Sequence, residues 1–228
     1  MTEPVLLVIA ALAGYLVGSI SFARVVGTRV APDEDLAAAE LQFHEGSEVV
    51  VSGVSATSVS IRAGRRWGLL VSLLDIGKAA LVTAVFRVLA PDEPAYLVAA
   101  FFAVVGHVWP AYYRFRGGFG VSPMLGGLLV IDPVALLVTI PVTIVIGAVL
   151  ADRLIVYDGW TLLLAPWFLI VRDDPAAALY GLLVAALYWW AMRVEVIDHI
   201  QRLRDGPRDW RSRFRDVQKG YTGHADVG

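Results

Sequence analysis

Long apolar runs are the feature that most constrains how this chain can fold. Runs long enough to cross the hydrocarbon core of a bilayer lie at 4–27, 67–90, 95–113, 134–151 and 175–193. In lipid, backbone N–H and C=O groups must be satisfied internally, so such runs predict α-helices. The composition, 57% hydrophobic and 18% charged, agrees with this. We therefore predict an all-α integral membrane protein.

Two shorter apolar runs, at 120–131 and 157–171, make the number of crossings depend on one dipeptide. The first of them meets its neighbour at Asp132 and Pro133. Proline cannot continue a helix without losing a hydrogen bond, and an aspartate is costly in lipid. We therefore place a break there and predict about seven transmembrane helices. One kinked helix across 120–150 would make six.

The basic residues predict which way the helices cross. Connections near 24–66, 114–116 and 153, with the tail after 193, hold most of the 19 Lys and Arg residues. The opposite connections, "APDEP", "DP" and "VRDDP", are mostly acidic. Because cytoplasmic loops are enriched in Lys and Arg, we predict an N-terminus outside and a C-terminus in the cytoplasm.

The domain organisation follows from the same runs. We expect residues 1–193 to form a single membrane domain with a cytoplasmic loop at 28–66, and residues 194–228 to form a cytoplasmic tail. Glu3 replaces the basic start of a secretory signal peptide, so the first helix is expected to be retained. After an acidic stretch at 31–48, the loop is β-branched and rich in hydroxyls, which suggests an irregular loop or a short strand.

The stretch "RFRGGFGV" begins with Arg114 and Arg116 directly after an apolar run. Its glycines, Gly117, Gly118 and Gly120, allow backbone N–H groups to converge on an anion because no Cβ stands in the way. With the charge of the arginines, a phosphate site is one interpretation. The other is a tight turn between packed helices, with the arginines acting only as topology signals.

Ionisable side chains within the apolar runs need partners. Asp75 and Lys78 are three residues apart and share one helical face, so we predict an ion pair with a structural role. His107 lies just before the glycine stretch. It is either a functional residue or a hydrogen-bonding member of an aromatic belt.

Small and hydroxyl residues close the first apolar run. Gly14 and Gly18 have the spacing that allows close helix contact. Ser19 and Ser21 either bond back to the helix backbone or offer hydroxyls to a ligand.

A second group of hydroxyls lies in the loop that follows. Ser52 and Thr57 precede Arg62 and Arg65, and hydroxyls with arginines can hold a phosphate. The alternative is a polar loop that carries topology charges.

Several stretches, in order along nearly the whole chain, resemble the motifs of one family. They read "GSISF" (18–22), "LLDIGKA" (73–79), "GHVWPAYYRFRGGFGVSP" (106–123) and "VIDHIQRL" (196–203). The bacterial acyl-phosphate-dependent glycerol-3-phosphate acyltransferases carry "GSIPF", "LDxxKG", "GHxFPxFxxFKGGKGVAT" and "HRxNIxRL". The third block is long and specific, and it favours the phosphate-site interpretation of the glycines.

The chain departs from those motifs at identifiable positions. Phe119 stands where the "GGKG" loop has its lysine, and Gly53 and Ser58 stand at the asparagines of the family's "GSGNxGATN" loop. The histidine of the last motif falls at Val196, which makes the nearby His199 a candidate substitute. The candidate replacements for the loop lysine are Arg62, Arg65, Arg114 and Arg116.

The resemblance implies a seven-helix enzyme of the bacterial inner membrane that transfers an acyl group from acyl phosphate to the 1-hydroxyl of glycerol 3-phosphate, giving lysophosphatidate. It makes Ser52, Thr57 and His199 the candidate catalytic residues. The candidate phosphate-binding residues are Ser19, Ser21, Arg62, Arg65, His107, Arg114, Arg116, Gly117, Gly118 and Gly120. Acyl phosphate, glycerol 3-phosphate and membrane lipids are the expected partners, with no metal, cofactor or nucleic acid.

Two other functions fit the same residues. One is a catalytically silent relative that binds a phospholipid or an acyl donor and regulates a partner. The other is an acyltransferase with a different acceptor, because the altered residues belong to the part that grips the acceptor.

Overall fold

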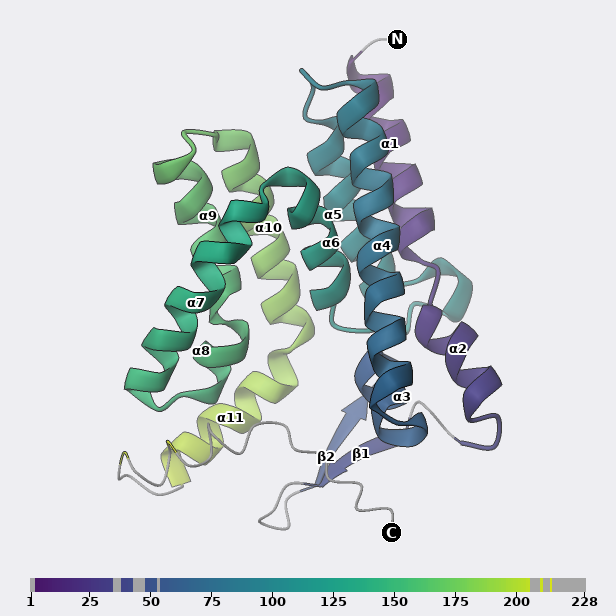
Figure 1. Ribbon diagram of the computed structural model, residues 1–228, viewed down its shortest axis with the longest axis vertical. Helices are drawn as coiled ribbons and strands as arrows, with labels where there is room; N and C mark the ends of the chain where they lie inside the picture. Colours follow the sequence, from purple (N-terminus) through teal and green to yellow (C-terminus); the bar gives the residue numbers. More distant parts are fainter. Residues whose placement is uncertain are drawn as a thin grey trace. The chain divides into compact units, whose positions relative to one another are not determined.

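The computed structural model describes residues 3–34, 38–42, 48–52, 54–205, 210 and 214. For 38–42, 48–52, 202 and 205 it describes the backbone alone. The fold is built of helices, as predicted, with one pair of short β-strands in the N-terminal quarter of the sequence (Figure 1). The chain divides into two compact units, one ending at Val130 and the other beginning at Ile131. The single membrane domain over 1–193 stays a prediction.

The first unit contains most of the motifs. Its elements are α1 (Glu3–Gly18), α2 (Phe22–Val30), β1 (Ala38–Gln42), β2 (Glu48–Ser52), α3 (Ala56–Ala63), α4 (Arg65–Leu89), α5 (Ala95–Val108), the 3-10 turn η1 (Ala111–Tyr113) and α6 (Val121–Ile131). Strands β1 and β2 pair antiparallel, with Ala38 opposite Ser52. Helices α1, α4 and α5 lie side by side (Figure 1).

The second unit is helical over its described length. Its elements are α7 (Pro133–Leu150), α8 (Arg153–Asp158), the 3-10 helix η2 (Gly159–Leu163), α9 (Leu164–Pro166), the π-helix η3 (Trp167–Val171), α10 (Pro175–Ala191) and α11 (Arg193–Asp205).

Apolar helices long enough to span a bilayer occur in both units. In the described residues there are 5 such spans, at Glu3–Val30, Arg65–Leu89, Ala95–Tyr113, Pro133–Leu150 and Arg153–Val171. The first of them combines α1 and α2, and the last combines α8, η2, α9 and η3. A sixth is reached if α10 and α11, bent by 66°, count as one span. Helix α6 is apolar but has only 11 residues. Seven crossings and their orientation therefore stay predictions.

The break predicted between α6 and α7 is confirmed. Helix α6 ends at Ile131, and α7 begins at Pro133 with Asp132 as its N-cap. The Asp132 carboxylate accepts a hydrogen bond from the Val134 amide at 3.0 Å. A proline at the first helical position loses nothing there, because that N–H has no partner within the helix.

One expectation about local structure was wrong, and a second was right only in part. The apolar run at 4–27 is not one helix, because α1 ends at Gly18 and α2 starts anew after Ser21, whose hydroxyl accepts from the Arg24 amide at 3.4 Å. The β-branched, hydroxyl-rich segment was expected to be an irregular loop or a short strand. Its first part is the strand β2, as expected, but its second part is the helix α3. Ser55 and Ser58 form a reciprocal capping box at its start, which satisfies amides that a loop would leave to water.

Glycines set the distance between α1 and α5. A Cβ at Gly14 would overlap the carbonyl oxygen of Ala99, and one at Gly18 would overlap that of Ala103. From the other side, a Cβ at Gly106 would overlap the carbonyl oxygen of Tyr15. The close contact predicted from the spacing of Gly14 and Gly18 is therefore confirmed, with α5 as the partner helix.

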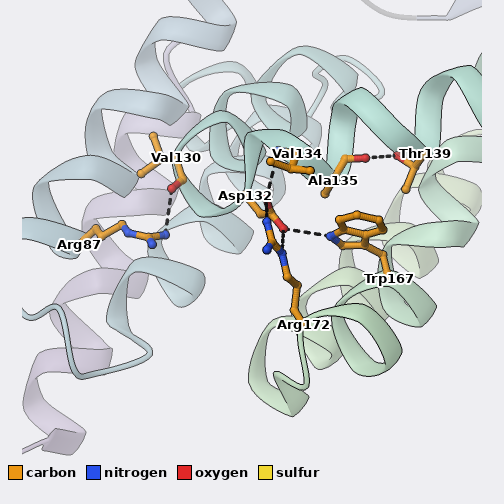
Figure 2. A network of polar contacts seen from close by, with 8 residues as sticks. All are labelled: Arg87, Val130, Asp132, Val134, Ala135, Thr139, Trp167 and Arg172. Atoms are coloured by element: carbon orange, nitrogen blue, oxygen red, sulfur yellow. Dashed lines mark hydrogen bonds and ion pairs between the residues drawn. The ribbon is translucent and has the colours of Figure 1, made fainter.

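Asp132 is the centre of a polar network in the second unit (Figure 2). Arg172 donates to both carboxylate oxygens, from Nε at 2.5 Å and from Nη2 at 2.6 Å. Trp167 donates from its indole nitrogen at 2.9 Å. The network fastens the start of α7 to the end of η3. Figure 2 also shows, within the first unit, Arg87 donating to the carbonyl oxygen of Val130 at 2.9 Å.

Replacing Asp132 with alanine is expected to lower the free energy of unfolding by more than the roughly 1 kcal/mol typical of an N-cap. The excess comes from Arg172 and Trp167, which lose their acceptor. Asp174→Ala is the matched control, because Asp174 caps α10 through the Ala177 amide at 2.9 Å. Thermal unfolding in detergent measures both variants. Equal losses would contradict a stabilising role for the Arg172 and Trp167 contacts.

The same pair of variants tests the pH dependence of this network. Burial raises the pKa of the Asp132 carboxyl, but hydrogen bonds from Arg172 and Trp167 and the Arg172 charge hold it below its ordinary value of 3.8. A carboxyl with a lowered pKa stabilises the fold above that ordinary value, and the contribution is lost as the pH falls through the folded-state pKa. The stability deficit of Asp132→Ala should therefore be constant above about pH 5 and shrink below about pH 4.

Candidate functional site

The glycine stretch forms a loop between α5 and α6. Helix α5 ends at Val108, and the chain turns through Arg114 and Phe115, both in the left-handed region with φ of 52° and 59°. Gly120 has a φ of 98°, which favours glycine, and α6 begins at the next residue. The loop therefore leads directly into a helix N-terminus.

Close contact with His107 holds the first half of the loop. The Gly118 amide donates to the carbonyl oxygen of His107 at 3.2 Å. A Cβ at Gly117 would overlap that same oxygen, and a Cβ at Gly118 would lie 2.6 Å from His107 Nε2. Both positions need glycine because the loop backbone lies against the end of α5.

Other loop amides are left with unused hydrogen-bonding capacity. Among the described residues, the amides of Gly117, Phe119 and Gly120 donate to no acceptor. Gly117 and Phe119 are half-buried, and Gly120 is buried. Backbone N–H groups in such a position are suited to bind an anion. The Gly118 amide was predicted to point at a phosphate with the others, but it donates to the carbonyl oxygen of His107.

A buried charged network lies behind the loop. Asp75 and Lys78 form an ion pair in α4, with Lys78 Nζ 2.6 Å from Asp75 Oδ1, and they are 1% and 6% exposed. Lys78 also donates to the carbonyl oxygen of Ile20 at 2.6 Å, in the break between α1 and α2. Its Nζ lies 3.2 Å from His107 Nδ1. The pair thus joins α4 to the α1–α2 break and to α5.

The network also orients the His107 ring. A charged Lys78 donates to Nδ1, which then acts as an acceptor and leaves the ring proton on Nε2. Nε2 is the atom nearest to a Cβ at Gly118. Lys78 therefore acts on the loop through the imidazole that the loop packs against.

The predicted serines at the end of α1 serve the backbone. Ser19 is fully buried, and its hydroxyl accepts from the Ala111 amide at 3.2 Å, just ahead of the loop. Tyr15 supports the same segment by donating to the carbonyl oxygen of Trp109 at 3.0 Å. Ser21 caps α2. Ser21 thus bonds to the backbone nearby, whereas Ser19 bonds to a distant segment, and a ligand role for either serine stays a prediction.

The other predicted residues of the first unit are spread over α3 and α4. Thr57 is exposed in the first turn of α3, and Arg65 is exposed at the start of α4. Arg62 forms an ion pair with Glu34 at 3.1 Å, so the acidic stretch supplies it with a partner. The side chain of Ser52 lies outside the described residues. The catalytic roles of Ser52 and Thr57 and the phosphate-binding roles of Arg62 and Arg65 stay predictions.

Arg114 and Arg116 lie in the loop itself with exposed side chains. The carbonyl oxygen of Arg116 accepts a hydrogen bond at 3.1 Å from Nη2 of Arg24, a residue of α2. The Arg24 guanidinium also lies 5.1 Å from the centre of the Tyr113 ring. In the sequence, Arg24 is one of the basic residues of the 24–66 connection that predict orientation, and nothing more. No local pattern marks it, because its partners are far along the chain.

His199 belongs to the second unit. Its Nε2 lies 3.1 and 3.2 Å from the two carboxylate oxygens of Asp152, the N-cap of α8. Burial raises the pKa of the Asp152 carboxyl, but the hydrogen bonds with His199 and the Ile155 amide outweigh this and lower it overall. A carboxylate that holds an imidazole fixes the orientation of the ring. The catalytic role of His199 stays a prediction.

Comparison with known proteins decides the family. A family model described as glycerol-3-phosphate acyltransferase matches residues 8–206. This chain belongs to the glycerol-3-phosphate acyltransferase family. A member from Agrobacterium fabrum is 32% identical over 209 residues, which cover 90% of this chain and 92% of the relative. The resemblance read from the motifs is thus confirmed.

Other members of the family match over different lengths. One from Maricaulis maris is 33% identical, and the match covers 86% of this chain and 85% of the relative. Glycerol-3-phosphate acyltransferase 5 of Dehalococcoides mccartyi is 32% identical over 143 residues. That match covers 61% of this chain and 55% of the relative, so the chain spans about half the length of that protein.

Solved structures of the family share the fold. The crystal structure of PlsY, an integral membrane glycerol 3-phosphate acyltransferase, in its glycerol 3-phosphate form matches with a TM-score of 0.70. The match has 23% sequence identity and covers 87% of this chain and 92% of PlsY. The lysophosphatidic acid form matches with a TM-score of 0.66. With the apolar helices described above, family membership confirms an all-α integral membrane protein.

Proposed function

We propose that this protein is an acyltransferase of the bacterial inner membrane, which moves an acyl group from acyl phosphate to the 1-hydroxyl of glycerol 3-phosphate. The observation that carries the proposal is the 116–120 loop. Its amides at Gly117, Phe119 and Gly120 have no acceptor among the described residues, and buried contacts hold the backbone in place. Family membership supplies the reaction class.

The reaction needs no covalent intermediate with the protein. The hydroxyl oxygen of glycerol 3-phosphate forms a bond to the acyl carbon, and the bond from that carbon to the phosphate oxygen breaks. Inorganic phosphate leaves, and the hydroxyl proton is released. Because acyl phosphate is already a reactive mixed anhydride, positioning and stabilisation of negative charge are the tasks left to the protein. A loop of fixed N–H donors performs both tasks for a phosphate.

Turnover by the purified protein tests the proposal. We expect the detergent-solubilised wild type to convert palmitoyl phosphate and labelled glycerol 3-phosphate to lysophosphatidate. A Phe119→Lys variant, which restores the lysine of the "GGKG" motif, is measured beside it. A folded wild type with no turnover above background, beside an active Phe119→Lys variant, would overturn the proposal and identify a silent relative.

A different acceptor is the second candidate function. The residues that favour it are Gly53 and Ser58, which stand at the family's asparagine positions. Release of inorganic phosphate from palmitoyl phosphate, measured with glycerol 3-phosphate, with glycerol and with dihydroxyacetone phosphate, compares the acceptors. Release that depends on glycerol 3-phosphate alone supports the first candidate. Release with another acceptor alone supports the second.

A further inference from the structure

Arg24 holds its guanidinium against the candidate loop from a different helix. It lies in the first turn of α2, after the N-cap Ser21. Its Nη2 donates to the carbonyl oxygen of Arg116 at 3.1 Å, and the guanidinium carbon lies 5.1 Å from the centre of the Tyr113 ring, in the segment before the glycines. Two independent contacts therefore place the Arg24 charge beside the loop.

One nitrogen of this guanidinium has no hydrogen-bond partner in the part of the chain that the structure describes. Arg24 Nε is buried, and it donates to no acceptor within the described residues. A buried donor that lacks an acceptor costs folding free energy, because the group has lost water without replacing it. Native proteins leave few such groups, and those that remain call for an explanation such as an absent ligand. An anionic ligand beside the loop would supply the missing acceptor.

The loop offers the same kind of unused donor. The amides of Gly117, Phe119 and Gly120 likewise donate to nothing in the described part of the chain. A guanidinium combined with backbone N–H groups is a donor set that suits the oxygens of a phosphate. Phe119 itself brings an apolar ring, so no cation comes from the position where the family motif has lysine.

The arginines expected from sequence to replace that lysine are placed differently. Arg62 pairs with Glu34. The other three candidates, Arg65, Arg114 and Arg116, have exposed side chains. A charge on an exposed side chain is weakened by water and salt, whereas a partly buried charge acts through a lower effective dielectric. Arg24 is partly buried and touches the loop, so it is the better placed of these cations.

We propose that Arg24 binds the phosphate group of a substrate at the glycine loop, in place of a lysine at position 119. The identity of the substrates rests on the proposed function, but phosphate binding by Arg24 does not. The phosphate belongs either to acyl phosphate or to glycerol 3-phosphate, and the two are separated by the kinetics below.

The first test measures binding of inorganic phosphate to the full-length protein in detergent by calorimetry. Arg24→Met is expected to raise Kd by about 10- to 100-fold, the range for hydrogen bonds to a charged group. Arg29→Met is the matched control. Arg29 lies on the same helix and is exposed, and it donates to the carbonyl oxygen of Val25 at 2.7 Å. Equal affinities for the two variants would overturn the proposal.

A rescue experiment asks whether Arg24 and position 119 serve the same phosphate. Adding Phe119→Lys to the Arg24→Met variant is expected to recover most of the lost affinity. A double variant as weak as Arg24→Met alone would contradict the exchange of roles between the two positions.

Turnover separates the two possible phosphates. In Arg24→Met, a raised KM for palmitoyl phosphate alone assigns Arg24 to the donor, and a raised KM for glycerol 3-phosphate alone assigns it to the acceptor. Unchanged values for both would overturn the proposal. A wild type that binds phosphate through Arg24 but shows no turnover would contradict the proposed function. It would still support phosphate binding by Arg24.

A further measurement needs no variant and so does not depend on how Arg24→Met folds. Phenylglyoxal modifies arginine side chains, and mass spectrometry locates the label. Inorganic phosphate is expected to slow labelling of Arg24 severalfold and to leave Arg29 unchanged. Equal slowing at both residues, or none at Arg24, would count against the proposal.

Discussion

Replacing Asp75 with alanine is expected to lower the free energy of unfolding by about 3–5 kcal/mol, the range for breaking a buried ion pair from one side. Lys78 is 6% exposed and would keep its charge inside α4 with no carboxylate beside it. The carbonyl oxygen of Ile20, the His107 ring and the face of the Phe22 ring would remain beside it, and none of them carries a negative charge. Unfolding in detergent, followed by heat or denaturant, measures the loss.

Two controls separate burial from charge. The double variant Asp75→Leu with Lys78→Met removes both charges together, so it should lose much less stability than Asp75→Ala. Glu34→Ala breaks the more exposed pair with Arg62, and it should cost at most about 1 kcal/mol. If Asp75→Ala lost no more stability than Glu34→Ala, the buried Asp75–Lys78 pair would not stabilise the fold more than an exposed pair does.

Replacing Gly117 with alanine is expected to reduce kcat/KM by about a hundredfold or more while the helices stay folded. The new Cβ would overlap the carbonyl oxygen of His107 and lie 2.8 Å from Pro110 Cδ. The loop must therefore move away from α5, and its amides leave the positions in which, under the proposed function, they bind the substrate phosphate. A displacement of about 1 Å at a reacting group is enough for such a loss.

Gly77→Ala is the matched control for this variant. Gly77 lies within α4, and a Cβ there meets no atom within 4 Å. Its turnover should equal that of the wild type, and its stability should rise by roughly 0.5–1 kcal/mol because alanine favours the helix. Circular dichroism checks that both variants are folded. Wild-type turnover by a folded Gly117→Ala would show that the loop position does not matter for the reaction.

Much of the fold could be predicted from local properties of the sequence. Apolar runs predicted the spanning helices, Asp132 and Pro133 predicted the break before α7, and Gly14 and Gly18 predicted a close helix contact. Each of these depends on the residue itself and its near neighbours. Lipid solvation, proline geometry and the absence of a Cβ act the same way wherever the chain goes.

The errors lie where a short polar contact competes with a longer pattern. Ser21 caps a new helix inside an apolar run that otherwise predicts one continuous helix. Ser55 and Ser58 start α3 in a segment whose β-branched residues suggested a loop or strand. In both places one or two hydroxyl contacts to backbone amides outweigh the weaker preference of the surrounding residues.

The sequence by itself determined that this chain is a helical membrane protein of the acyltransferase family with a glycine loop after α5, because solvation by lipid and glycine geometry are local. Only the tertiary structure decided which side chains serve that loop. In the folded chain, Arg62 forms an ion pair with Glu34. The Ser19 hydroxyl accepts from the Ala111 amide, and Arg24 donates to the carbonyl oxygen of Arg116. Such partners are chosen by packing between distant segments, which no short stretch of sequence records.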